Sequence, residues 1–440
     1  MRKNEHLLWL GLCRRAWLIV ALNIFYIRPQ AQILTLEDAL AAALRNNYDI
    51  LLAKNEAEIA AQQHSPGNAG MLPRVQANVS NNFSLTALNQ RLANGNEINR
   101  PGVTGNNLQA GVSLQWTLFD GLRMFAANDR LKHEKEASLL QIKDAVQQTV
   151  ADVIRVYYDI VRAEQLLRAT EKAIALADER MRLAELRQKT GIGSKAELLQ
   201  ARMDRNENLS ALLEQKQSIA QRKADLNRLL ARDADAEFTV TDTIPLLREP
   251  LTQIAETNNI QIKIADERVA IAQAMRREAF AQFFPVLNGA VGYQFNRNIN
   301  SAGFFLVNQN NGITAGVSLQ IPLFNGLNTL RQYKVATLAL QSAQFMAARA
   351  RFEAIQTQRR AVSDYTAAIG RMQLEEESMM LAEEYLALAG ERYRAGQSTI
   401  LELREAELHY TRARSRMVQA RYAAKVAETE LLLLRGELVR

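Results

Sequence analysis

Cysteine and histidine are scarce in this chain. Cys13 is the only cysteine among 440 residues, so neither an internal disulfide nor a four-cysteine zinc site can form. The four histidines, His6, His64, His133 and His409, stand far apart and lack the close spacing of helical metal ligands. We therefore expect no metal, no cofactor and no cysteine nucleophile.

Proline is missing where it would interrupt helices. Of 8 prolines, none lies between Pro101 and Pro245 or after Pro322. These two stretches, each longer than a hundred residues, are free of the strongest helix breaker. Long helices can form in both.

No apolar run is long enough for a transmembrane helix, which needs about 20 residues. The apolar residues 16–27 follow four basic residues, a pattern typical of a secretory signal peptide, here residues 1–31 with cleavage near Ala31. A lipid anchor on Cys13 is the alternative. It is disfavoured because bulky Leu12 precedes the cysteine, where a small residue is expected.

Excess positive charge is concentrated in this leader. The net charge is +7, and residues 1–31 contribute five basic residues and one acid, or +4, which leaves +3 for the remainder. Nucleic-acid binding needs a concentrated basic face, so we expect no nucleic-acid partner.

The chain contains an internal repeat. Residues 110–122 (AGVSLQWTLFDGL) and 315–327 (AGVSLQIPLFNGL) are identical at ten of thirteen positions, at an offset of 205. Upstream, Asn46-Asn47 and Pro73 recur at an offset of 212. The sequence therefore predicts two repeats, 32–250 and 251–440, the first ending in a linker at 231–250. The offsets change within the polar stretches 86–107 and 299–312, which we expect to be surface loops.

Each repeat has two segments in which apolar and polar residues alternate. These segments, 74–85 and 108–118 in the first repeat and 286–295 and 313–323 in the second, predict four strands. Strands of about ten residues suit a tilted membrane crossing. A soluble β-sandwich is the alternative. The polar face is uncharged, as in the lumen of a barrel, and its residues include Ser113, Gln115, Ser318 and Gln320.

The other segments predict helices. The long ones, 123–189 and 328–394, would each span roughly 100 Å at 1.5 Å per residue. In the first, Val150, Val153, Tyr157 and Ile160 follow the alternating spacing of three and four residues of a coiled-coil seam. Shorter helices are predicted at 36–64, 194–230, 251–283 and 399–434.

Pro66 should end the first short helix early, because proline breaks helices. The second repeat has Glu278 at the equivalent position, so its helix should continue there. Short helices stacked end to end would match the long ones in length, so these helices predict a tall helical cylinder.

A glycine followed by a capping sequence joins each long helix to the next short one. The glycine can adopt the left-handed conformation that ends a helix, and Ser or Thr three residues later, with Glu three further, has the spacing of a capping box. These residues are Gly191, Ser194 and Glu197 in the first repeat and Gly396, Thr399 and Glu402 in the second. The pattern predicts two tight helical hairpins.

Glu402 and Glu405 lie on one face of the helix after the second hairpin. A solvated helix face, or acids favoured by the helix dipole, is the simpler interpretation. The other is that these carboxylates line a pore.

In combination these motifs resemble those of the TolC-like outer-membrane efflux protein family, over essentially the whole chain after the leader. The resemblance rests on AGMLP at 69–73, LFDG at 118–121, LFNG at 323–326 and YRAG at 393–396 through Thr399 to Leu403. It implies a homotrimer whose chains share a barrel of twelve strands in outer-membrane lipid, continued by a coiled-coil tunnel through the periplasm. It also implies two partners, a periplasmic adaptor and an inner-membrane pump, and function as the exit duct of a tripartite efflux pump. The outer-membrane component of a type I protein secretion system is the alternative.

The resemblance also implies roles for particular residues. Glu402, Glu405 and Tyr393 fall where the family has its pore constriction and closed-state contacts. Ser398 stands where some members have an arginine latch, so we expect the acidic ring to have lost one neutralising partner. The hairpins would dock the adaptor, with Arg187 and Arg392 offering charged contacts.

Two other classes of protein fit less well. An enzyme is disfavoured, because no GxSxG motif, glycine-rich phosphate loop or His/Cys cluster occurs and no catalytic residue stands out. A soluble periplasmic coiled-coil scaffold would leave the four alternating strands without a purpose.

Overall fold

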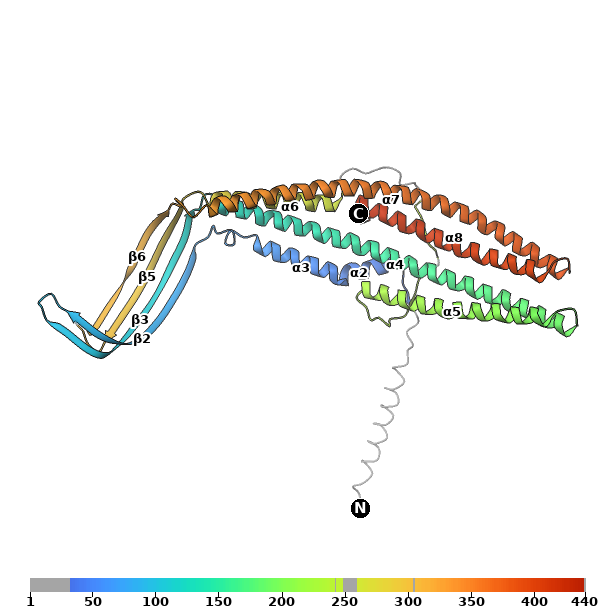
Figure 1. Cartoon of the computed structure of the whole chain (residues 1–440), viewed down its shortest axis with the longest axis horizontal. Helices are drawn as coiled ribbons and strands as arrows, with labels where there is room; N and C mark the ends of the chain where they lie inside the picture. The colour runs from blue at the N-terminus through green and yellow to red at the C-terminus, as the bar shows by residue number, and fades with distance from the viewer. Residues whose placement is uncertain (1–31, 242, 248–258, 304, 439–440) are drawn as a thin grey trace, which may run out of the picture. The chain divides into compact units, whose positions relative to one another are not determined.

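The computed structural model describes residues 32–241, 243–247, 259–303 and 305–438 (Figure 1). The expected signal peptide, with Cys13, lies outside the described residues. The chain divides into two compact units, one made of Met1–Asn47, Thr149–Thr252 and Ala361–Leu431, and the other of the remaining segments. We call them the helical unit and the strand unit. No helix among the described residues is long and apolar enough to cross a membrane.

The strand unit contains one antiparallel sheet in the order β2-β3-β5-β6, so that β2 and β6 form its two edges (Figure 1). Its strands are β2 (Arg74–Arg91), β3 (Glu97–Phe119), β5 (Val286–Asn300) and β6 (Val307–Gln320). All four predicted strands are confirmed. β6 ends at Gln320 rather than at residue 323, and Pro322, which has no N–H to donate, follows.

The predicted loops at 86–107 and 299–312 are mostly wrong, because pairing continues through both stretches. β2 remains paired with β3 as far as Arg91 and Glu97, and β5 with β6 as far as Ile299 and Val307. In these stretches polar side chains lie on both faces of the strands, so the alternation of apolar and polar residues that predicts a strand is absent. They do not disturb the backbone hydrogen bonds that hold a ladder together.

The helices of the strand unit are α3 (Tyr48–Gln63), α6 (Ile260–Ala281) and the first parts of α4 (Arg123–Lys189) and α7 (Asn328–Arg394). At an offset of 212, α3 ends six residues before α6 does, and a turn follows at Pro66. The predicted early end of the first short helix is confirmed. Part of the predicted helix 251–283 lies outside the described residues.

The prediction of a single helix at 36–64 is wrong, because α2 (Leu36–Asn46) ends before Asn47. This residue has extended backbone angles, and its side-chain Nδ2 donates to the carbonyl of Leu229 at 3.0 Å. In the second repeat Asn259 caps the start of α6, its Oδ1 accepting from the N–H of Gln261 at 2.9 Å. The repeated asparagine therefore marks a helix start in both repeats.

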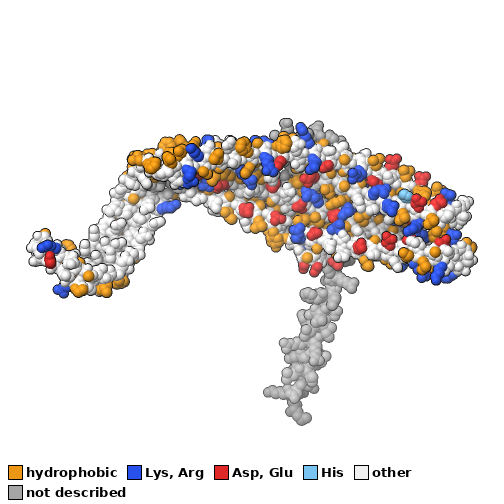
Figure 2. Space-filling view, in the orientation of Figure 1, with side chains coloured by type: hydrophobic (Ala, Val, Ile, Leu, Met, Phe, Trp, Pro, Cys, Tyr) orange, Lys and Arg blue, Asp and Glu red, His pale blue; other side chains and the backbone are white. Residues whose placement is uncertain are grey.

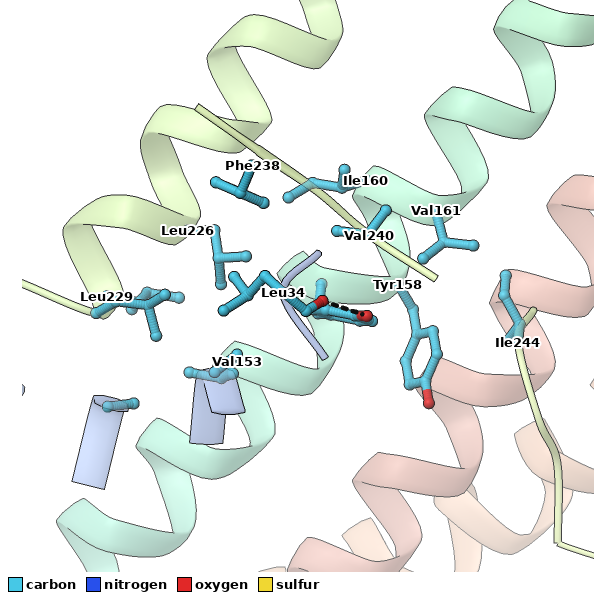
Figure 3. Packing of buried hydrophobic residues seen from close by; sticks show 14 residues of the cluster. Leu34, Val153, Tyr158, Ile160, Val161, Leu226, Leu229, Phe238, Val240 and Ile244 are labelled. Atoms are coloured by element: carbon cyan, nitrogen blue, oxygen red, sulfur yellow. Dashed lines mark hydrogen bonds between the residues drawn. The ribbon is translucent and has the colours of Figure 1, made fainter. Parts of the chain in front are cut away.

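The helical unit contains α2, the second parts of α4 and α7, α5 (Lys195–Leu229), most of α8 (Ile400–Arg435), and the short parallel pair β1 (Gln32–Ile33) and β4 (Phe238–Thr239). Its core gathers apolar side chains from α2, α4, α5 and β4, together with Leu34, which follows β1, and Val240 and Ile244, which follow β4 (Figure 3). The predicted seam residues Val150, Val153, Tyr157 and Ile160 are buried.

The linker between the repeats is fastened to this core. The hydroxyl of Tyr157 donates to the carbonyl of Leu34 at 2.9 Å and accepts from the N–H of Thr241 at 3.2 Å. Further along, the fully buried carboxylate of Glu428 accepts from the N–H of Leu247 at 2.8 Å. Buried hydrogen bonds of this kind fix a segment whose own secondary structure is only the two-residue strand β4.

Candidate functional site

The strand register divides the sheet into two faces. In an antiparallel pair, residues directly opposite each other share a face. Ser113 lies opposite Gly292, which lies opposite Thr314, and residues two apart along a strand stay on one face. The predicted lumen residues Ser113, Gln115, Ser318 and Gln320 therefore share one face.

That face is polar and almost uncharged. It holds a shallow depression of about 290 Å³ lined in part by Asn78, Ser80, Gln109 and Gln294. The side of the sheet seen in Figure 2 carries almost no charged side chains, whereas the helices carry many. The opposite face is apolar, with Val112 opposite Tyr293, Leu114 opposite Val291, and Leu319 opposite Leu287.

The two hairpins of the helical unit end their long helices in the same way. Gly191 and Gly396 have φ of 79° and 71°, the left-handed conformation. The N–H of Ile192 donates to the carbonyl of Arg187 at 3.0 Å, and that of Gln397 to the carbonyl of Arg392 at 2.9 Å. This is the hydrogen-bond pattern of a Schellman motif, so the predicted glycine caps are confirmed.

The hydroxyl caps are confirmed as well. The Oγ of Ser194 accepts from the N–H of Glu197 at 3.1 Å, and the Oγ1 of Thr399 accepts from the N–H of Glu402 at 3.3 Å. In the second hairpin the Glu402 side chain binds a neighbouring arginine, as described below. Both hairpins thus have rigid starts and ends.

Arg187 and Tyr393 connect the first hairpin to the second. The Nη1 of Arg187 donates to the Tyr393 hydroxyl at 3.0 Å, and the guanidinium lies 5.4 Å from the centre of the tyrosine ring. Tyr393 is buried by this contact and its neighbours. A hydrogen bond together with a cation–π interaction makes this a strong link between α4 and α7.

Arg392 binds Glu402, one of the two acids expected to line a pore. Its Nη1 lies 2.9 Å from Oε1 of Glu402, whereas the side chain of Glu405 is 67% exposed and lies 3.7 Å from His409. Ser398 supplies no positive charge to these acids, but Glu402 has a partner from elsewhere. Arg392 supplies the positive charge from the preceding helix, and Glu405 keeps an exposed negative charge.

A buried ionic cluster lies deeper in the helical unit. The guanidinium of Arg180, on α4, donates to Oε2 of Glu407 at 2.7 Å and to Oδ2 of Asp204 at 2.6 Å. Arg404 also contacts Asp204, at 3.0 Å. Arg180 thereby holds α5 of the first hairpin and α8 of the second at one point.

Glu407 is held in an unusual electrostatic state. Burial, together with nearby Asp204, raises the pKa of its carboxyl to about 7, and Arg180 and Arg404 only partly offset this. Beside the cluster is a cavity of about 340 Å³, lined by Leu176, Leu183, Leu386 and Leu403 among others.

The cluster is not predicted from the sequence, because its members are far apart in the chain and are not repeated. One signal was present. Arg180 lies between Ala177 and Ala184 at the spacing of three and four residues that marks a buried seam. A charged residue at such a position needs buried partners.

Among the described residues, no group of three or more His, Cys, Asp or Glu side chains could hold a metal ion. The interactions described above are ionic pairs and hydrogen bonds between helices, and the sheet presents an uncharged polar surface.

Comparisons with known proteins agree with this arrangement. A family model described as outer membrane efflux protein matches residues 39–232 and 251–437. Protein CyaE of Bordetella pertussis is 26% identical over 347 residues, which covers 76% of this chain and 72% of CyaE.

Two solved structures have the same fold. The CmeC outer membrane channel of Campylobacter jejuni matches with a TM-score of 0.80 at 19% identity, covering 91% of this chain and 86% of CmeC. The outer membrane protein VceC of Vibrio cholerae matches with a TM-score of 0.76 at 18% identity, covering 91% of this chain and 96% of VceC.

Proposed function

The chain belongs to the outer membrane efflux protein family, and from this premise we propose that it is the trimeric exit duct of a tripartite efflux pump. It is an outer-membrane protein with its helical part in the periplasm. In the proposed pump it receives substrates from a periplasmic adaptor and an inner-membrane pump and releases them outside the cell.

The two-faced sheet is the observation that carries this proposal. An apolar face opposite an uncharged polar face suits a wall between lipid and water. Unpaired edges are not tolerated in lipid, so a sheet of four strands must be closed by other copies. Two copies would give a barrel of eight strands, and side chains would fill its interior. Three copies would give twelve strands and leave a lumen.

The proposed constriction is formed by Glu402, Glu405 and Tyr393. With three copies, the two acids would place six carboxylates around one opening. Because Arg392 pairs with Glu402, Glu405 supplies most of the unbalanced charge. The Arg187–Tyr393 link holds the two hairpins together in the closed state, so that opening requires this link to loosen.

Adaptor docking is assigned to the hairpins. Each hairpin presents a turn that is capped at both ends. The two turns therefore offer the adaptor two rigid surfaces of similar shape. The docking residues are Arg187, Gly191, Ser194 and Glu197 on the first hairpin, and Arg392, Gly396 and Thr399 on the second.

Two measurements test the channel. In a strain that lacks its own exit duct, expression of the chain with a cognate adaptor and pump should restore efflux of a pump substrate. Purified protein should run as a trimer before heating and conduct ions in planar bilayers. A monomer without conductance would reject the proposal.

Single-channel conductance tests the constriction. Glu405→Gln should weaken cation preference and block by divalent ions more than Glu402→Gln does, because Glu402 is already paired. Glu197→Gln, at the equivalent position on the first hairpin, is the matched control. Unchanged selectivity in the Glu402→Gln, Glu405→Gln double variant would favour the solvated-face interpretation.

A further inference from the structure

One charged residue lies on the apolar face of the sheet. Arg74 and Arg297 are the only charged residues in the paired strand segments 74–86, 103–119, 286–300 and 307–320. Arg74 lies opposite Gln115 and therefore on the polar face. Arg297 follows Tyr293 by four residues on β5 and shares its apolar face. An arginine on a lipid-facing surface is costly near the bilayer midplane and inexpensive at the membrane edges.

The position of Arg297 along β5 places it at such an edge. It follows Leu287, which lies on the apolar face just after α6, by ten residues. At about 3.4 Å per residue this is about 34 Å of strand, and a tilt of about 35–45° reduces the height to roughly 24–28 Å. The apolar band of outer-membrane barrels is about 25 Å tall. Because the helical part is periplasmic, Arg297 lies at the edge of the outer leaflet.

The neighbours of Arg297 on this face include several side-chain amides. Gln309 lies directly opposite on β6, and Asn311 and Asn106 lie diagonally on the two flanking strands. The Nδ2 of Asn311 lies 3.4 Å from the hydroxyl of Tyr293, an aromatic residue of the kind that lines membrane edges. A guanidinium surrounded by amides offers many N–H donors, which suits an anion with several oxygen atoms.

The acids of the strands do not balance this cation. Glu97 is the only acid in β2, β3, β5 and β6, and it pairs with Arg91 at 3.3 Å beside the turn between β2 and β3. Further copies in the proposed trimer have the same strands, so they add no other acid from them. A balancing anion therefore has to come from the surroundings, and at a membrane edge the phosphates of lipids are the anions at hand.

We propose that Arg297 binds the phosphate of a phosphorylated glycolipid in the outer leaflet, and that the amides of Gln309 and Asn311 bind its sugar. The guanidinium offers two parallel donors to a phosphate, and an amide can both donate to and accept from a hydroxyl. Phe295, two residues before Arg297, belongs to the apolar rows along which the acyl chains of the same lipid would lie. The inference rests on the proposed barrel and identifies a lipid that the barrel binds.

Lipid retention tests this site. The full-length protein is placed in nanodiscs of phosphatidylcholine with a small fraction of lipid A, and the lipid A that stays on each released oligomer is counted by native mass spectrometry. Arg297→Gln should retain several-fold less lipid A than the wild type. Arg297→Lys should retain an intermediate amount, because lysine keeps the charge and loses the paired donors.

Arg74→Gln is the matched control. It removes the other charged residue of the paired segments, which lies on the polar face, and should retain as much lipid A as the wild type. Equal retention by the wild type and Arg297→Gln would overturn the proposal and leave an arginine that only extends into water. An equal loss in Arg74→Gln and Arg297→Gln would overturn it too, because a general loss of positive charge would then explain the result.

Two further probes identify the bound group. Dephosphorylated lipid A in the same discs should be retained by the wild type several-fold less than lipid A. Inorganic phosphate, added in the same amount as the lipid A, should leave retention unchanged, because it lacks acyl chains. Equal retention of the two glycolipids would exclude a phosphate contact, and loss of lipid A to inorganic phosphate would assign the site to a free anion.

Oligomeric state and conductance, measured in phosphatidylcholine alone, separate this inference from the proposed function. If the wild type is trimeric and conducts but shows no preference for lipid A, only the lipid site fails. If no wild-type sample contains a conducting trimer, the proposed function fails as well. Arg297→Gln should form the trimer normally, since its side chain is exposed and has no role in the fold of the sheet.

Discussion

The first and second helical hairpins turn in the same way but are held by different contacts. Arg187 and Arg392 occupy equivalent positions, at an offset of 205, yet Arg187 binds Tyr393 and Arg392 binds Glu402. The first hairpin is also tied to the second by Arg180, whose counterpart is Tyr385. The repeated glycine and capping residues thus determine the conformation of each turn. The contacts of the turn depend on nearby residues that are not repeated.

We expect the largest effect from removing Arg180, because its ionic contacts with the second hairpin are not repeated by Tyr385 at the equivalent position. Arg180→Ala leaves Glu407 and Asp204 buried without their main partner, which should cost about 3–5 kcal/mol of stability. Urea unfolding followed by circular dichroism at about pH 8 measures it.

Tyr385→Ala is the matched variant of the second repeat, and its cost should be clearly smaller. Adding Glu407→Gln and Asp204→Asn to an Arg180→Met variant should recover most of the loss. Equal losses at residues 180 and 385 would show that the two hairpins do not differ in this respect.

The next effect concerns a feature that the repeats share. Leu114→Arg and Leu319→Arg should each cost about 2–4 kcal/mol if these side chains face the bilayer midplane. Folding into lipid vesicles in urea measures the cost in both repeats. Arginine at Ser113 or Ser318, one residue away on the polar face, is the control. Equal assembly of all four variants would refute the assignment of one face of the sheet to lipid and the other to water.

The pH dependence of stability tests the buried cluster. Because the folded state raises the pKa of Glu407 from its ordinary 4.5 to about 7, the folded chain binds more protons between these pH values. Stability should therefore fall as pH rises from about 4.5 to 7, by roughly 1–3 kcal/mol.

Glu407→Gln should flatten that decline, and Glu405→Gln, which removes an exposed acid, should not. Unfolding midpoints at several pH values decide between them. The same slope in the wild type and in Glu407→Gln would mean that another group titrates.

The smallest expected effect is at the hairpin glycines. Gly191→Val and Gly396→Val force a branched residue into the left-handed conformation, at a cost of about 1–2 kcal/mol each. Thermal unfolding measures the cost, and cross-linking to the adaptor measures docking. Gly370→Val, within α7 and with open space around it, is the control. Undisturbed adaptor cross-linking in both hairpin variants would argue against docking at these turns.

Local patterns were sufficient to predict much of the fold. The strands, the long helices, the glycine caps and the hydroxyl caps follow from alternation, the absence of proline and short capping sequences. Each of these depends on residues within one or two turns of the chain. The face shared by Ser113, Gln115, Ser318 and Gln320 also follows from alternation, once the register is known.

Features that depend on distant residues were not predicted. The helix break at Asn47 is supported by the carbonyl of Leu229, and the Arg180 cluster joins residues from three helices. The neutralisation of Glu402 required knowing that Arg392 faces it across the turn. In each case the packing of the helices brings the partner residue close, and this packing cannot be read from the neighbouring sequence.

The linker fastened by Tyr157 and Glu428 has a consequence for the equilibrium of assembly. If the repeats were separate chains, a ring of three copies would need six pieces to meet. Joining them covalently makes the β3–β5 junction intramolecular, at an effective concentration of about millimolar for a short linker. In the proposed ring only the contacts between chains then depend on concentration, so at equilibrium the concentration of complete rings varies with the third power of the free-chain concentration rather than with the sixth power of the concentration of free repeats.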